Sequence, residues 1–101
     1  MSKPFFEFFC PVKVIAGHAA LEHMAFDLGT LAARRPLLVT DAGVRRAGLL
    51  AIVETALRTG GVEPGAVFDD VPPDSSLHTV RKVAAAYRES GCDAIVAVGG
   101  G

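Results

Sequence analysis

The sequence is poor in cysteine, in net charge and in long apolar runs, and each scarcity argues against a class of protein. Its two cysteines, Cys10 and Cys92, stand far apart and outside any C-x-x-C pair, which favours reduced, buried thiols in a cytoplasmic protein over a disulfide or redox role. The net charge is −1, with acids and bases interspersed, so nothing favours binding to nucleic acid or to an anionic membrane surface. No apolar run approaches the roughly 20 residues of a membrane span, and the aromatic start lacks the apolar core and cleavage site of a secretory leader.

The composition is that of one globular domain. Half of the 101 residues are apolar and 21% are charged, which excludes a disordered chain and leaves no room for two domains. The pairs Arg34-Arg35 and Arg45-Arg46 are too short to be basic patches and are predicted to be solvated.

The spacing of apolar residues changes several times along the chain and predicts alternating helices and strands. Helices are expected at 19–33, 49–57 and 77–87, and strands at 37–41, 66–68 and 93–98. Segments 5–9 and 12–15 are expected to form a pair of short edge strands. Strands that alternate with helices favour a parallel sheet with right-handed crossovers. The predicted fold class is therefore α/β, a Rossmann-like parallel sheet with flanking helices and an N-terminal edge strand pair.

Polar or glycine-rich segments follow each of the three main strands, where ligands bind in open α/β sheets. Asp41 ends the first strand, and its carboxylate suits either the two hydroxyls of an adenosine ribose or the N-cap of the next helix. Gly99, Gly100 and Gly101 end the last strand. Glycines there allow backbone N–H groups to approach phosphate oxygens, although a tight turn or a flexible end also explains them.

The loop 69–76 follows the middle strand. Its Asp74-Ser75-Ser76 segment is first of all a helix N-cap region and secondarily a ligand contact. Pro72 and Pro73 stiffen the loop.

No catalytic or metal-binding group is predicted within this chain. His18 and His23 are five residues apart and face different sides of a helix, and no H-E-x-x-H cluster is present. His23 and Asp27 share a helix face, as do Asp74 and His78 if their helix starts early, but two ligands do not close a metal site. No base is evident for Ser90 or Cys92 as a nucleophile.

Four segments in this order, FFCPVKVIAG, LLVTDAGV, VFDDVPPDSSL and DAIVAVGGG, resemble the N-terminal, cofactor-binding part of the iron-containing (group III) alcohol dehydrogenases. The resemblance matches Gly99, Gly100 and Gly101 to the family's GGGS pyrophosphate turn, and Thr40-Asp41 to a T-D pair that is associated with NAD rather than NADP. The family's P-N-P-[ST] loop corresponds to Pro73-Asp74-Ser75-Ser76, with Asp in place of Asn and Ser in place of the second Pro. The cofactor-binding residues that we expect are Asp41, Pro73, Asp74, Ser76, Gly99, Gly100 and Gly101.

The resemblance implies that residues 1–101 are the NAD-binding N-terminal domain, or a fragment of it, without the helical metal domain. The parent enzyme would catalyse reversible hydride transfer between NAD and a small alcohol, aldehyde or hydroxy acid. Its divalent iron or zinc would be held by one Asp and several His outside this chain, so the chain alone is expected to be inactive. The parent is expected to be a cytoplasmic homodimer or larger homo-oligomer, binding a dinucleotide and a small-molecule substrate but neither nucleic acid nor membrane.

Several alternatives stay open on the sequence. Within the same fold, the parent could be a maleylacetate reductase, a glycerol dehydrogenase-type member or an NAD enzyme of the dehydroquinate synthase type. In another class, the chain could be a stand-alone nucleotide-binding or partner-binding module without catalysis.

Overall fold

The computed structural model describes residues 12, 15–17, 19–74 and 76–99. Its centre is a parallel sheet of three strands, β1 (Pro36–Val39), β2 (Ala66–Phe68) and β3 (Ala94–Ala97), in the order β2-β1-β3. The helices are the 3₁₀ turn η1 (Ala20–His23), α1 (Met24–Thr30), α2 (Ala42–Arg46), α3 (Leu49–Thr59) and α4 (Leu77–Glu89). The predicted α/β class, with a parallel sheet between helices, is confirmed.

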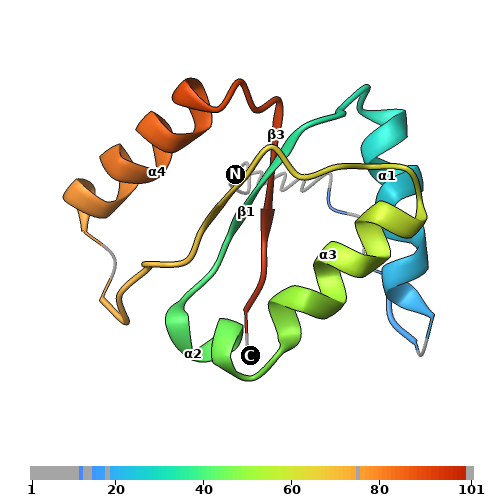
Figure 1. The fold of residues 1–101 in the computed structure, drawn as a ribbon, viewed down its shortest axis with the longest axis horizontal. Coiled ribbons are helices and arrows are strands. Elements are labelled where there is room, and N and C mark those ends of the chain that lie inside the picture. Colours follow the sequence, from blue (N-terminus) through green and yellow to red (C-terminus); the bar gives the residue numbers. More distant parts are fainter. Residues whose placement is uncertain (1–11, 13–14, 18, 75, 100–101) are drawn as a thin grey trace, which may run out of the picture.

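The helices cover both faces of the sheet (Figure 1). The connection from β1 to β2 carries α3, and the connection from β2 back past β1 to β3 carries α4. Connections of one hand that run in opposite directions place their helices on opposite faces. The sheet order reverses at β1, and in such sheets the reversal marks the ligand crevice.

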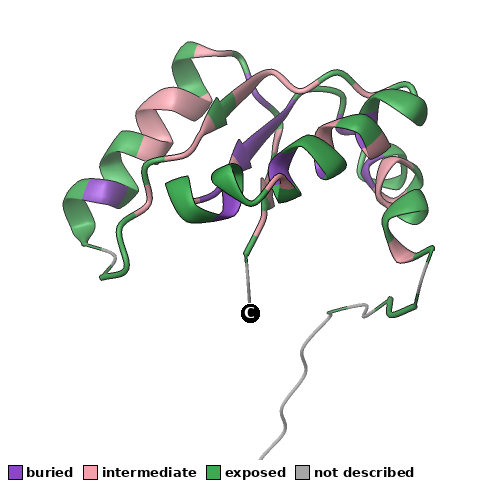
Figure 2. Ribbon diagram, turned by 60° about the horizontal axis from the view of Figure 1, so that its bottom comes forward, coloured by how far each residue is buried: buried purple, intermediate pink, exposed green. Residues whose placement is uncertain are grey.

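The hydrophobic core lies between the sheet and the α1–α3 face. Leu38 of β1 and Leu57 of α3 are fully buried there, and the other buried residues of the cluster are Leu28, Ala33, Leu50 and Val53. Figure 2 shows this burial concentrated on β1 and the facing helices. β3 instead alternates between half-buried and exposed residues, so its second face is uncovered in the described chain. Only the central strand therefore has the covering on both faces that its apolar run predicted.

Several element boundaries differ from the sequence prediction. β1 ends at Val39 and not at residue 41, β3 is Ala94–Ala97 and not 93–98, and α3 and α4 each end two residues later than expected. The first helix ends at Thr30 and does not run to residue 33, because Ala32 takes a left-handed conformation (φ 57°). The Ala33 N–H then donates a hydrogen bond to the Leu28 carbonyl at 2.9 Å, which closes the helix end. Pro36 therefore begins β1 and does not end a helix. The short helix α2 was not predicted. The expected strand at 5–9 lies outside the described residues, as does the middle of the one at 12–15.

The amino ends of β1 and β3 are joined by Asp93. Its carboxylate accepts the backbone N–H groups of Arg34 and Arg35, both at 2.8 Å. These hydrogen bonds, that of Arg34 first, hold the pKa of the Asp93 carboxyl below its ordinary value. The register of the strands is thus fixed at the edge opposite to the candidate site.

Candidate functional site

The carboxyl ends of β1 and β3 are tied together by Thr40, which is 3% exposed. The Thr40 hydroxyl donates to the Val98 carbonyl at 2.8 Å, and the Val98 N–H donates to the Val39 carbonyl at 2.9 Å. The Thr40 N–H also bonds the Phe68 carbonyl of β2 at 2.8 Å. These bonds extend the sheet beyond its regular strands and fix where the next residues, Asp41 and Gly99, leave it.

Two adjoining hollows open at this edge. The strand-end pocket, of about 250 Å³, is lined by both strand ends and includes Thr40, Asp41, Val71 and Gly99. The loop pocket, of about 580 Å³, is lined by α2 and the loop after β2, and includes Asp41, Arg46, Val71 and Pro73. Asp41 and Val71 line both pockets, so the two hollows adjoin at these residues, with Gly99 on one side and Arg46 on the other.

Asp41 caps helix α2. Its backbone is extended (φ −111°, ψ 166°), and its Oδ1 accepts the Val44 N–H at 2.8 Å. The capping interpretation is therefore realised in the structure. The second carboxylate oxygen has no hydrogen bond among the described residues, and the half-buried side chain faces both pockets. One oxygen can thus cap the helix while the other receives a ligand hydroxyl.

Gly99 is exposed, and a Cβ built on it would have no atom within 4 Å. Nothing in the described chain therefore requires glycine at this position, and the space above the backbone is free for a ligand group. Gly100 and Gly101 lie outside the described residues, so their role in a phosphate-binding turn stays a prediction.

The loop after β2 contributes differently at each predicted residue. Pro73, with Pro72, lines the loop pocket. Asp74 is exposed. Ser76 is the N-cap of α4, and its Oγ accepts the Thr79 N–H at 3.3 Å. The structure therefore shows the capping function of this segment, whereas contact of Pro73, Asp74 or Ser76 with a cofactor stays a prediction.

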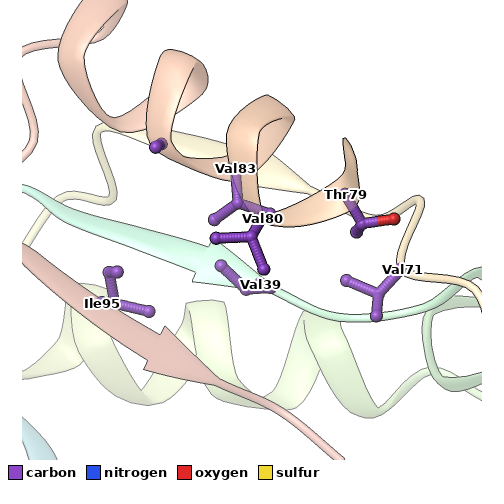
Figure 3. Close-up of a pocket in the computed structure, with 7 residues that line it drawn as sticks. Val39, Val71, Thr79, Val80, Val83 and Ile95 are labelled. Atoms are coloured by element: carbon purple, nitrogen blue, oxygen red, sulfur yellow. The ribbon is translucent and has the colours of Figure 1, made fainter. Parts of the chain in front are cut away.

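An apolar groove lies between α4 and the sheet (Figure 3) and adjoins the strand-end pocket at Val39 and Val71. Val80 and Val83 of α4 face Val39 of β1 and Ile95 of β3 across it, and Thr79 supplies a hydroxyl at one end. Val80 and Ile95 are 58% and 56% exposed. Phosphates and ribose hydroxyls need several polar partners, which this groove lacks. The polar surface from Gly99 to Arg46 is the better dinucleotide site.

Two arginines lie beside the site, at positions that the sequence did not predict. Both are exposed, as expected, and Arg45 pairs with Asp69. Arg46 is exposed at the loop pocket and has no ion pair within the part of the chain that the structure describes. Their positions depend on α2, whose five residues bury only Val44 and leave no apolar repeat to detect.

The described residues contain no group of three or more His, Cys, Asp or Glu side chains placed to hold a metal ion. His23 and His78 are exposed, and His18 lies outside the described residues. None of the described helices is long and apolar enough to cross a bilayer.

Comparison with known proteins adds the family context. The model of the family described as "Iron-containing alcohol dehydrogenase" matches residues 11–101. 4-Hydroxybutyrate dehydrogenase of Cupriavidus necator is 44% identical over 91 residues, which cover 80% of this chain and 23% of that protein. 1,3-Propanediol dehydrogenase of Klebsiella pneumoniae is 36% identical and covers 100% of this chain and 26% of that protein. The chain thus spans about a quarter of the length of these relatives.

The solved structures agree with the sequence comparisons. The crystal structure of a 1,3-propanediol oxidoreductase superposes with a TM-score of 0.76 at 38% identity, over 84% of this chain and 22% of that chain. Maleylacetate reductase from Agrobacterium tumefaciens has a TM-score of 0.79 over 99% of this chain and 27% of that chain, but at 21% identity it supports the fold alone.

Proposed function

The chain belongs to the iron-containing alcohol dehydrogenase family, and from this premise we propose that it is the dinucleotide-binding part of an NAD-dependent oxidoreductase. Its relatives are oxidoreductases that include hydroxybutyrate and propanediol dehydrogenases. The observation that carries the proposal is the meeting of Asp41 and Gly99 on one surface at the point where the sheet order reverses.

The residues along this surface indicate in which orientation the cofactor would bind. Phosphate oxygens fit best at the Gly99 end, where no side chain blocks the backbone. The adenosine ribose fits at Asp41, whose free carboxylate oxygen accepts from its hydroxyls. The adenine then lies against Pro72 and Pro73 in the loop pocket. Asp74 and Ser76, at the far end of the loop, would approach only the outer side of such a ligand.

The dinucleotide, when bound, would carry the hydride to or from a small alcohol, aldehyde or hydroxy acid. The chain's own residues would bind and orient its adenosine half. The described residues do not offer a set of metal ligands, so no step is assigned to a metal through them. We propose that the divalent iron or zinc of the parent enzyme is held by residues outside 1–101. We also propose that the parent is a cytoplasmic homo-oligomer.

A chimera tests the proposed reaction. Residues 1–101 would replace the matching quarter of the Klebsiella 1,3-propanediol dehydrogenase, and NADH formation from 1,3-propanediol would be followed by absorbance with iron supplied. We expect alcohol-dependent NADH formation. A folded chimera that binds the metal but forms no NADH would contradict the proposal.

The role of Asp41 is tested in the same chimera with two variants. Asp41→Asn keeps an N-cap for α2 but removes the negative charge, whereas Asp41→Ala removes both. We expect both variants to lose preference for NAD over NADP, because the carboxylate accepts from the ribose hydroxyls and repels a 2′-phosphate. If only Asp41→Ala had an effect, Asp41 would act through the helix cap alone.

A further inference from the structure

Arg46 lies beside the proposed adenosine site, and none of the interactions described so far involves its charge. It lies in the last turn of α2 and lines the loop pocket together with Asp41 and Pro73. The adjacent Arg45 is neutralised by Asp69, but Arg46 has no ion pair among the described residues. The guanidinium is therefore available to an anion that enters this pocket.

The position of Arg46 along the surface decides which anion it would meet. The strand-end pocket includes Gly99 but not Arg46, and the loop pocket includes Arg46 but not Gly99. Asp41 lies between them because it lines both. A pyrophosphate at Gly99 is thus on the far side of Asp41 from Arg46. A group on the ribose 2′ position, beside Asp41 and toward Pro73, is on the near side.

We infer that Arg46 binds the 2′-phosphate of an adenosine nucleotide, so that the site accepts NADP as well as NAD. This inference rests on the proposed adenosine site. Asp41 and Arg46 then act in opposite directions. The carboxylate repels the 2′-phosphate, and the guanidinium offers it a charge-assisted, bidentate hydrogen bond. Arg46 narrows the preference for NAD that Asp41 alone would set.

Small ligands isolate this contact in the 101-residue chain itself. 5′-AMP and adenosine 2′,5′-bisphosphate differ only by the 2′-phosphate, so the ratio of their dissociation constants reports that group. The ratio would be measured by calorimetry or NMR titration for the wild type, Arg46→Ala, Arg46→Lys and Arg58→Ala. Arg58 is the matched control, since it is an exposed arginine on α3 that pairs with Glu54 and Glu63.

We expect Arg46→Ala to weaken the bisphosphate about tenfold, the scale of one charge-assisted hydrogen bond, while 5′-AMP changes less than about twofold. Arg46→Lys should restore part of the loss because it keeps the charge but not the fork. Arg58→Ala should leave both constants unchanged. Inorganic phosphate at the same concentration should not displace the bisphosphate, because recognition needs the nucleoside as well.

The other outcomes separate the possible failures. Equal weakening of both ligands by Arg46→Ala would overturn the inference and indicate stacking on adenine instead. Loss of stability without a change in the ratio would also overturn it, and would reduce Arg46 to a cation at the carboxyl end of α2. If the chain binds 5′-AMP but Arg46→Ala leaves the ratio of dissociation constants unchanged, only the inference is refuted. Wild-type chain that binds neither nucleotide would refute the adenosine site and the inference together.

Discussion

Replacing Thr40 with valine tests whether its hydroxyl holds the two strand ends together. Valine keeps the branched shape of threonine but cannot donate to the Val98 carbonyl, which now receives the hydroxyl at 2.8 Å. A typical hydrogen bond contributes about 1 kcal/mol, and leaving a buried carbonyl without its donor costs about 1–3 kcal/mol. Because Thr40 is 3% exposed but Val98 is only half-buried, water can replace part of the loss. We expect a decrease of about 1–2 kcal/mol in the free energy of unfolding.

Urea unfolding followed by circular dichroism measures this change, and thermal unfolding should show a Tm lower by about 4–8 °C for each kcal/mol. Thr79→Val is the matched control. Thr79 is also buried, at 7% exposure, but among the described residues its hydroxyl is hydrogen-bonded only with the Ser76 Oγ, at 3.3 Å, so the same atomic change should cost less. If Thr40→Val were as stable as the wild type, or no worse than Thr79→Val, the proposed tie between the strand ends would be refuted.

Three further predictions concern the rest of the fold. Asp93 accepts two backbone N–H groups, which lower its pKa from 3.8, so its contribution to stability is present above that pH and is lost as the pH falls through the folded-state pKa. As the pH is lowered, the urea midpoint of unfolding should therefore fall less steeply for Asp93→Asn than for the wild type, and parallel curves would contradict this. Gly65→Ala should destabilise by about 1–3 kcal/mol, because its Cβ would lie 2.8 Å from the sulfur of the buried cysteine. The control Gly29→Ala, with open space in α1, should be neutral or stabilising, and equal effects would refute the close contact. In sedimentation at increasing concentration, the wild-type chain should associate through the apolar groove, and Ile95→Asp should weaken this association. The control Ile52→Asp, at a residue that is 54% exposed on α3, should leave the association unchanged. Equal association of the two variants would argue against the groove.

The sequence predicted the elements whose apolar pattern repeats. The 66–68 strand and the start of the helix at Leu77 have the predicted positions. The strand is a short apolar run, and the helix has apolar residues at helical spacing after the capping Ser76. The edge where Asp41 and Gly99 meet followed from parallel topology alone. Their chemical roles as cofactor residues remain proposals.

What the sequence could not predict depends on contacts between distant segments. The end of α1 is set by the left-handed backbone conformation of residue 32, which alanine rarely adopts. The buried hydrogen bond of Thr40 depends on the register of β1 against β3. The place of Arg46 depends on α2, which is too short to show a period. Each of these needed the three-dimensional arrangement.

NMR titration of NAD into the isotope-labelled 101-residue chain tests whether a dinucleotide binds at the edge formed by the ends of β1 and β3. We expect saturable shifts concentrated at Thr40, Asp41 and Gly99, with Val80 and Ile95 of the apolar groove unaffected. Shifts that centre on Val80 and Ile95, or no saturable shifts at all, would contradict it.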